Sequence, residues 1–250
     1  MTTLYLKADD SIAPYVILSG DPWRVETLAG LLDEPRHVAF AREYNTYTGS
    51  YRGVPVTISS TGIGGPSAAI AMEELYECGM RVAVRMGTVM ALRDDLLGKF
   101  VIPVASIRQE GTTDAYVPSG YPAVADFELL RHMNDAVTAA GSEYVNGLNC
   151  TLDGFYTHMK HSRLSRERGL DIEGGFDELR ALGVQGLDME SATVLTLARL
   201  MGIRGVVVTL ATVLEGLKGA LEGETRKAAE ALLCQVALDG IYRFAQEDES

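Results

Sequence analysis

A glycine turn followed by an arginine is the first place in this chain where the residue types suggest chemistry. The apolar run 15–18 leads into Gly20, and Arg24 follows four residues later, where a helix is expected to begin. Glycine lets backbone N–H groups approach an anion closely, arginine is a forked cationic donor, and a helix N-terminus favours negative charge. The segment therefore predicts a phosphate site, although a turn beside a surface arginine is its plainer interpretation.

Two more arginines could complete such a site. Arg85 lies inside the apolar run 82–87 and is followed by Gly87 and Thr88. A charged side chain in an apolar strand needs a partner, which is either a structural ion pair or a phosphate cradled with the Thr88 hydroxyl. Arg42 is a third candidate, with a surface salt bridge as the competing interpretation.

A pair of carboxylates, Asp188 and Glu190, opens the expected helix 189–201. Acids at a helix start can be purely structural caps. Glu190, however, leads into an apolar face and needs strong donors there, which two sugar hydroxyls would provide. The turn 61–66 resembles half of a dinucleotide motif, but Pro66 and the lack of a matching acid favour close approach to a small ligand or tight packing.

The elements that must position these residues follow an α/β pattern. Strands rich in Val and Ile are expected at 15–19, 54–60, 82–87, 100–107, 147–152 and 205–211. Helices are expected from after Gly65 to before Gly79, and at about 126–140, 189–201 and 224–245. This order predicts one α/β domain over residues 1–250, with a central mixed sheet flanked by helices. The segment 153–180 is the least regular and could be a mobile flap or part of a binding site.

The composition narrows the function classes. The chain has 250 residues, of which 47% are apolar, and its net charge of −12 argues against binding to nucleic acid or an anionic membrane. Cys78, Cys150 and Cys234 are scattered and are expected to be buried, reduced thiols. No signal peptide or membrane-spanning run is visible, so a cytoplasmic location is expected. His158 and His161 have no acidic partner motif, so no metal site is expected.

Taken in order, these motifs resemble the nucleoside phosphorylase family, which contains uridine phosphorylase and the hexameric purine nucleoside phosphorylases. The matching segments cover nearly the whole chain: Gly20-Asp21-Pro22-x-Arg24, Arg42-Glu43, Ser60–Ser67, Glu73-Glu74-Leu75, Arg85-x-Gly87-Thr88, Tyr121–Asp126 and Met189-Glu190-Ser191-Ala192. As an ordered set they are highly specific. The stretches 60–67 and 121–127 look closest to the uridine phosphorylase branch.

The resemblance implies a site residue by residue. Phosphate would be held by Gly20, Arg24, Arg85 and Thr88, with Arg42 reaching in from a neighbouring subunit; ribose would be held by Met189 and Glu190, with Tyr5 in the place of a neighbour's histidine. Phosphorolysis passes through an oxocarbenium-like sugar, so phosphate held below the ring would also stabilise the developing charge. Arg24, Arg85 and Glu190 are therefore the expected catalytic residues, and no metal or organic cofactor is needed.

The base half of the expected site departs from the family. Met90 stands where the family usually has glycine, while the aromatic pair survives as Phe155 and Tyr156. Met159 and His161 align with the glutamine and arginine that grip uracil. Three interpretations stay open: another side chain of 153–180 (Lys160, His158 or Arg163) reads the base, the leaving group is smaller or more apolar, or the protein is a weak or inactive paralogue. His161 is the candidate proton donor to the leaving base.

The expected function is therefore phosphate-dependent cleavage of the N-glycosidic bond of a nucleoside, giving ribose 1-phosphate and free base through an atypical base pocket. A purine or modified-nucleoside phosphorylase, a nucleosidase that uses water, and an inactive phosphate- or ribosyl-binding protein are the alternatives. The expected partners are a nucleoside, inorganic phosphate and further copies of the chain, as a dimer or a hexamer built as a trimer of dimers.

Overall fold

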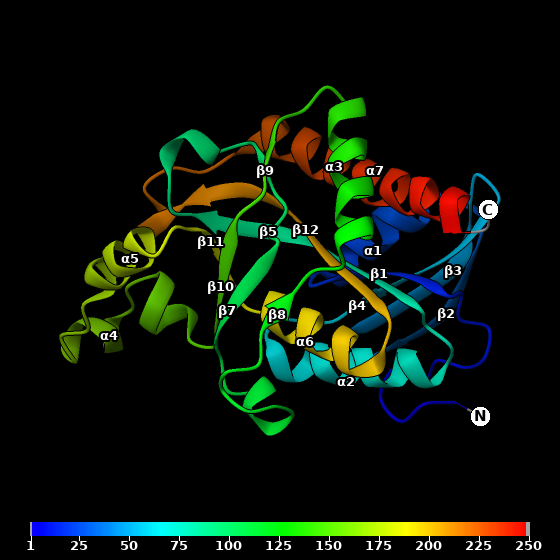
Figure 1. Ribbon diagram of the computed structural model, residues 1–250, viewed down its shortest axis with the longest axis horizontal. Helices are drawn as coiled ribbons and strands as arrows, with labels where there is room; N and C mark the ends of the chain where they lie inside the picture. The colour runs from blue at the N-terminus through cyan, green and yellow to red at the C-terminus, as the bar shows by residue number, and fades with distance from the viewer. Residues whose placement is uncertain (1, 249–250) are drawn as a thin grey trace.

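A mixed sheet of twelve strands runs through the centre of the computed structural model, which describes residues 2–248 (Figure 1). Its main path is β2-β3-β4-β1-β5-β11-β10-β7-β8; β12 pairs with β5 and β6, and β9 pairs with β6. The strands are β1 (Tyr15–Ser19), β2 (Asp33–Ala41), β3 (Tyr44–Tyr51), β4 (Val54–Ser60), β5 (Val82–Ala91), β6 (Phe100–Val101), β7 (Ala105–Gln109), β8 (Ala123–Val124), β9 (Tyr144–Val145), β10 (Leu148–Leu152), β11 (Val184–Asp188) and β12 (Arg204–Leu214).

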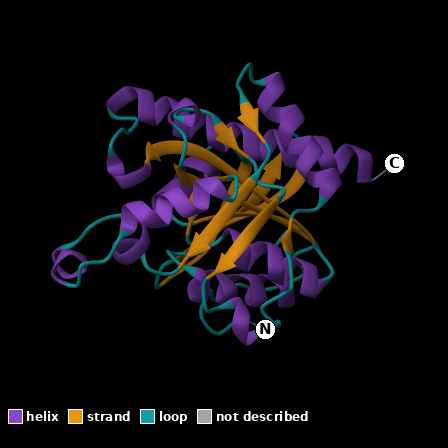
Figure 2. Ribbon diagram, turned by 60° about the vertical axis from the view of Figure 1, so that its left-hand side comes forward, coloured by secondary structure: helices purple, strands orange, loops and turns teal. Residues whose placement is uncertain are grey.

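Helices cover both faces of the sheet, as Figure 2 shows. They are α1 (Pro22–Ala29), α2 (Gly65–Glu77), α3 (Phe127–Ala139), α4 (Arg163–Glu167), α5 (Ile172–Ala181), α6 (Ser191–Met201) and α7 (Gly223–Asp248), with the short turns η1 (Asp94–Leu96), η2 (Thr113–Ala115), η3 (Phe155–Met159) and η4 (Glu215–Leu217). Side chains of α1, α3 and α7 share one apolar cluster, and those of α2 and α6 share another. The expected α/β domain with a mixed, helix-covered sheet is confirmed.

Strand β1 illustrates why the central strands read as continuous apolar runs. Tyr15 and Ile17 point into the cluster with α1 and α7, whereas Val16 and Leu18 point into the cluster with α2 and α6. Successive side chains of a strand face opposite sides, so a strand that is covered on both faces needs apolar residues at every position.

Strand β5 joins the two halves of the sheet because it is longer than its neighbour β1. Their parallel pairing ends at Ser19 and Met86, while β5 continues to Ala91 and there pairs with the antiparallel strand β11. The part of β5 beyond Met86 is thus free of β1 and faces the turn that follows Ser19. This arrangement brings the Gly20 and Arg85 segments together.

Several expectations about the elements were wrong. The expected strand 100–107 is split into β6 and β7, with Pro103, which has no N–H to donate to a ladder, between them. The segment 153–180 is not irregular, because it folds into η3, α4 and α5. Strands β2, β3 and β11 and the two-residue strands β8 and β9 were not expected; β2 is mostly exposed and carries little apolar signal.

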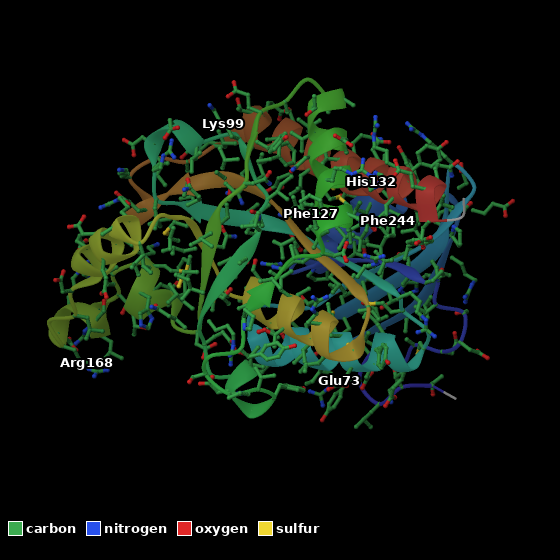
Figure 3. The ribbon with its side chains drawn as sticks, in the orientation of Figure 1. Glu73, Lys99, Phe127, His132, Arg168 and Phe244 are labelled. Carbon is green, nitrogen blue, oxygen red and sulfur yellow. The ribbon has the colours of Figure 1, made fainter. Side chains whose placement is uncertain are left out.

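The composition also led to expectations about the cysteines, the histidines and membrane-spanning segments. All three cysteines are free, but only Cys150 and Cys234 are buried; Cys78 is half-buried, contrary to the expectation. Burial raises the pKa of Cys150 to about 12 and that of Cys234 to about 11. His132 packs edge-on against Phe244 between α3 and α7, with ring centroids 5.7 Å apart (Figure 3). Over residues 2–248, no helix is long and apolar enough to cross a membrane, and no cluster of potential metal ligands occurs.

Candidate active site

A cavity of about 470 Å³ opens where β1 ends beside β5. Nine of the side chains and turns expected from the sequence line it: Gly20, Arg24, Arg85, Thr88, Met90, Phe155, Met159, Met189 and Glu190. They come from four separate segments, 20–24, 85–90, 155–159 and 189–190, so the fold assembles one site from motifs that are far apart in the chain. Gly87, Asp188 and Leu187 line it as well, although the sequence did not single out Gly87 or Leu187 for the cavity.

The turn after β1 begins helix α1 at the edge of this cavity. Asp21 caps the helix by accepting from Trp23 N at 2.9 Å, and Pro22 occupies the first turn, where its missing N–H costs nothing. Arg24 follows two positions after Pro22, and its Nη2 lies 3.3 Å from Oε1 of Glu230 on α7. Arg24 is thus tethered at the cavity by a carboxylate that the sequence did not connect with it.

Arg85 is the most buried cation of the cavity. Its Nε donates to Asp188 Oδ2 at 3.3 Å, and its Nη2 pairs with Glu190 Oε2. Nη1, by contrast, has no hydrogen-bond partner within residues 2–248. It lies only 3.1 Å from the point where a Cβ on residue 87 would be, so the guanidinium lies across the backbone of Gly87. One edge of Arg85 is held by carboxylates, and the other is available to a ligand.

This cluster holds two negative charges and one positive charge with little exposure to water. Burial opposes the charge of Arg85, but Glu190 and Asp188 outweigh burial and raise the pKa of the guanidinium above its ordinary value. Burial also raises the pKa of Glu190, a shift opposed by Arg85 and reinforced by Asp188. Arg85 therefore forms the structural ion pair that was one of its two interpretations, while its position at the cavity leaves the phosphate interpretation a prediction.

Glu190 is tied to the glycine turn that precedes α2. Its Oε1 accepts from Gly64 N at 2.6 Å. Gly64 has a φ of +95°, a conformation that glycine adopts readily and other residues rarely do. The turn presents a backbone donor to the buried carboxylate, and its Ile63 lines the cavity, so close approach to a small ligand stays a prediction beside this packing.

The cap of helix α6 is also assigned by the structure. Glu190 occupies the N-cap position without a side-chain cap bond, whereas both oxygens of Asp188 accept from Ser191 N, at 3.1 and 3.2 Å. Of the two carboxylates, Asp188 therefore performs the capping role, and Glu190 faces Arg85 and the cavity.

The other half of the cavity is apolar. Met90, Met159 and Leu187 belong to one buried cluster, against which Phe155 and Val213 pack. Leu217 closes the same side from η4. The side chains lining this half carry no N–H or O–H group and no oxygen acceptor, so shape and dispersion rather than hydrogen bonds would select what enters.

Three expected site residues lie outside this cavity. His161 lines a neighbouring cavity of about 230 Å³ on the far side of Met159, because its Nε2 is bound to Glu173 on α5 at 2.9 Å. The expectation that it lines the base pocket is therefore wrong for this structure. Arg42 and Tyr5 lie together at the surface, with the Arg42 guanidinium 5.2 Å from the Tyr5 ring centroid. Arg42 makes no ion pair within residues 2–248, contrary to the surface salt-bridge interpretation.

Comparison with known proteins covers most of the chain. Residues 14–240 match the family model of the phosphorylase superfamily. A uridine phosphorylase of Thermococcus kodakarensis is 38% identical over 239 residues, which are 95% of this chain and 84% of that protein. The Escherichia coli uridine phosphorylase is 34% identical over 95% of each chain. A guanosine phosphorylase of Halorubrum lacusprofundi is 35% identical over 82% of this chain and 80% of its own.

Solved structures agree with this placement. The crystal structure of uridine phosphorylase from Vibrio fischeri superposes with a TM-score of 0.83 at 29% sequence identity, covering 97% of this chain and 98% of the other. The resemblance drawn from the motifs is confirmed, and so is the prediction of a nucleoside phosphorylase-type pentosyltransferase. The chain belongs to the phosphorylase superfamily, with uridine phosphorylases among its relatives.

Proposed function

We propose that this protein cleaves the N-glycosidic bond of a nucleoside with inorganic phosphate, releasing a free base and ribose 1-phosphate. The observation that carries the proposal is the divided cluster around Arg85: carboxylates hold one edge of the guanidinium, and Nη1 lies free over Gly87 beside Thr88. The uridine and guanosine phosphorylases among the relatives support this reaction class.

The phosphate half of the site supplies charge and hydrogen-bond donors. Arg24 and Arg85, with the Thr88 hydroxyl and the backbone at Gly20, would hold phosphate below the sugar. Glu190 would accept hydrogen bonds from the ribose hydroxyls beside Met189. One phosphate oxygen then forms a bond to C1′ as the C1′–N bond breaks, and the electron pair of that bond leaves with the base. The anionic phosphate stabilises the positive charge that develops on the sugar.

The apolar half of the cavity, where the base would lie, lacks the hydrogen-bonding side chains that would recognise uracil. Met90 and Met159 contribute no hydrogen bonds, and His161 is turned away to Glu173. We propose that the site selects its base by shape, and that purine or modified nucleosides are turned over as well as, or better than, uridine. The reaction needs phosphate as co-substrate and no metal or organic cofactor.

The position of Arg42 supports an oligomeric active unit. Arg42 and Tyr5 are stacked together at the surface, away from the cavity of their own chain. Both residues are available to complete the cavity of a second copy, with Arg42 reaching phosphate and Tyr5 reaching ribose. We propose a homodimer as the minimal active unit, which could assemble further into a hexamer.

A panel of pyrimidine and purine nucleosides, incubated with and without inorganic phosphate, tests the function. Ribose 1-phosphate formed only in the presence of phosphate supports the proposal. Free ribose formed without phosphate would show a nucleosidase instead. No turnover of any nucleoside, with phosphate still bound in calorimetry, would point to a binding protein without this activity. Dilution of the enzyme below its dimer dissociation constant should abolish turnover if Arg42 acts across the interface.

A further inference from the structure

We propose that Asp188 is a positioning residue for phosphate: it fixes the Nε edge of Arg85 so that Nη1 is presented over Gly87 to the anion. The inference rests on the proposed function, which assigns phosphate to Arg85. Asp188 itself is 4% exposed and lines the cavity, where its Oδ2 accepts from Arg85 Nε.

Every partner of Asp188 is a donor. Its oxygens accept from Arg85 Nε at 3.3 Å, from Thr151 Oγ1 at 2.9 Å, and from both the backbone N–H and the hydroxyl of Ser191. A carboxylate is an acceptor at every position, whereas an amide must point an N–H₂ group at one of its neighbours. The pocket around Asp188 is therefore built for a carboxylate and would be disturbed by the equally large asparagine.

The orientation of Thr151 shows that this arrangement is directional. Its hydroxyl oxygen accepts from Ala192 N at 2.8 Å, so its proton is left to donate to Asp188. Ser106 Oγ lies 3.0 Å from the same hydroxyl and, with that proton committed, must be the donor. Residues of β10 and α6 thus donate directly to the Asp188 carboxylate, and Ser106 of β7 donates to Thr151. These bonds fix the carboxylate, which accepts from Arg85 in turn.

The second carboxylate alone would not fix Arg85. Glu190 contacts only Nη2, and the proposed ribose hydroxyls compete for the same carboxylate. Asp188 contacts Nε and also lies 3.3 Å from Nη2, which sets the plane of the guanidinium. Because planar guanidinium donors have a fixed fork geometry, holding Nε and Nη2 determines where Nη1 points. Asp188 would keep that direction constant while Glu190 turns to the sugar.

Calorimetric titration of the full chain with inorganic phosphate, together with initial rates at varied phosphate, tests the proposal. Asp188→Asn should weaken phosphate binding and lower kcat/KM for phosphate by roughly 10–100-fold, the range seen when partners that orient a ligand are removed. The KM for the nucleoside should change much less. Asp188→Glu keeps the charge and the acceptors, and it should recover most of the loss.

Asp126→Asn is the matched control. Asp126 also caps a helix, accepting from Leu129 N at 3.0 Å, and also pairs with an arginine, Arg204, at 2.8 Å, but it lies outside the cavity. An equal effect of Asp126→Asn on phosphate would mean that Asp188 acts only as a helix cap. Unchanged phosphate affinity in Asp188→Asn, or equal losses in Asp188→Asn and Asp188→Glu, would overturn the proposal.

A milder variant covers the case in which Asp188→Asn does not fold. Ser191→Ala removes one hydroxyl donor from Asp188 and keeps the backbone cap. It should raise the phosphate dissociation constant a few-fold, and an unchanged constant would count against the positioning role. If the wild-type chain binds phosphate but cleaves no nucleoside, the proposed function fails, while the phosphate affinities of these variants still decide the role of Asp188.

Discussion

The two halves of the cavity are built in opposite ways. In the polar half, Arg85, Asp188 and Glu190 are nearly inaccessible to water and hold one another by charge and hydrogen bonds. In the apolar half, Met90 and Met159 lie in a cluster with no directional contacts. Buried polar groups are costly unless every partner is in place, whereas apolar cores accept changes of similar volume. The first half is therefore expected to resist substitution and the second to permit it.

The largest expected effect is that of Arg85→Ala. The change removes the donors proposed for phosphate and leaves the Asp188 and Glu190 carboxylates buried without their cation. Turnover should fall by roughly 10³-fold or more, as for the loss of a main electrostatic donor, and the remaining rate should no longer depend on phosphate. Breaking a buried ion pair also costs about 3–5 kcal/mol of stability, so the thermal midpoint is measured alongside the rates. Unchanged kinetics would remove phosphate from this half of the cavity.

Glu190→Gln should separate sugar binding from phosphate binding. The amide keeps the shape of the side chain but accepts less strongly from the ribose hydroxyls, so kcat should fall by about 10²-fold. Asp188 still holds Arg85, and phosphate affinity should be spared. The check is a comparison of calorimetric phosphate binding with turnover, and full activity in this variant would contradict the ribose role.

Gly87→Ala probes the close approach of Arg85 to the backbone. A Cβ there would lie 3.1 Å from Nη1, and the guanidinium would have to shift by a few tenths of an ångström. We expect the KM for phosphate to rise by roughly 10-fold, since small displacements of positioning groups are costly. Gly175→Ala on α5 is the matched control, because a Cβ there meets no atom within 4 Å. Equal behaviour of the two variants would show that Gly87 is not a spacer for Arg85.

Met159→Gln tests the apolar half. Glutamine restores the residue type that the family resemblance implies for gripping uracil, so the ratio of kcat/KM for uridine to that for a purine nucleoside should rise several-fold, the value of one added hydrogen bond. The KM for phosphate should stay constant, because Met159 belongs to the apolar cluster and not to the charged group around Arg85. Met159→Leu, an apolar exchange, serves as the control. A rise in phosphate KM would mean that the two halves are not independent.

The smallest expected effect is a change in how the free energy of unfolding depends on pH. Burial raises the pKa of Glu190 above its ordinary value of 4.5, with Asp188 adding to the shift and Arg85 opposing it. The native protein therefore keeps a proton there at a pH where the unfolded chain has lost it. This contribution makes the free energy of unfolding fall as pH rises from about 4.5 through the native pKa. Urea unfolding across that window should show a shallower fall in Glu190→Gln than in the wild type.

The part of the site that could be predicted consists of residues whose role is visible in their immediate sequence neighbours. Arg85 could be identified because burying a cation in an apolar strand costs much free energy unless the cation has a charged partner. The turn at Gly20 could be identified because it directly follows an apolar strand and is followed within four residues by an arginine. The grouping of Arg85 with Asp188, 103 residues later, depended on the antiparallel pairing of β11 with β5. That pairing has no local signal, because β11 was not recognisable as a strand.

The unpredicted part of the fold has a similar cause. Strand β2 is mostly exposed, so its residues show no apolar alternation, and it is held by pairing with β3 rather than by burial. The segment 153–180 is rich in glycine and charge, yet side-chain caps at Ser162 and Asp171 start two helices within it. His161 is held by Glu173 on the second of these helices, a contact that only the fold creates.

The bond between Gly64 and Glu190 gives this site an unusual evolutionary property. The donor is a main-chain N–H, so an exchange of side chain at that position cannot delete it, apart from an exchange to proline, which has no N–H and cannot adopt the observed φ of +95°. Random mutation can strain the turn but can scarcely remove the donor. The hydrogen bond therefore depends on the backbone conformation at residue 64, which glycine adopts readily, and on the glutamate 126 residues later, rather than on two matched side chains.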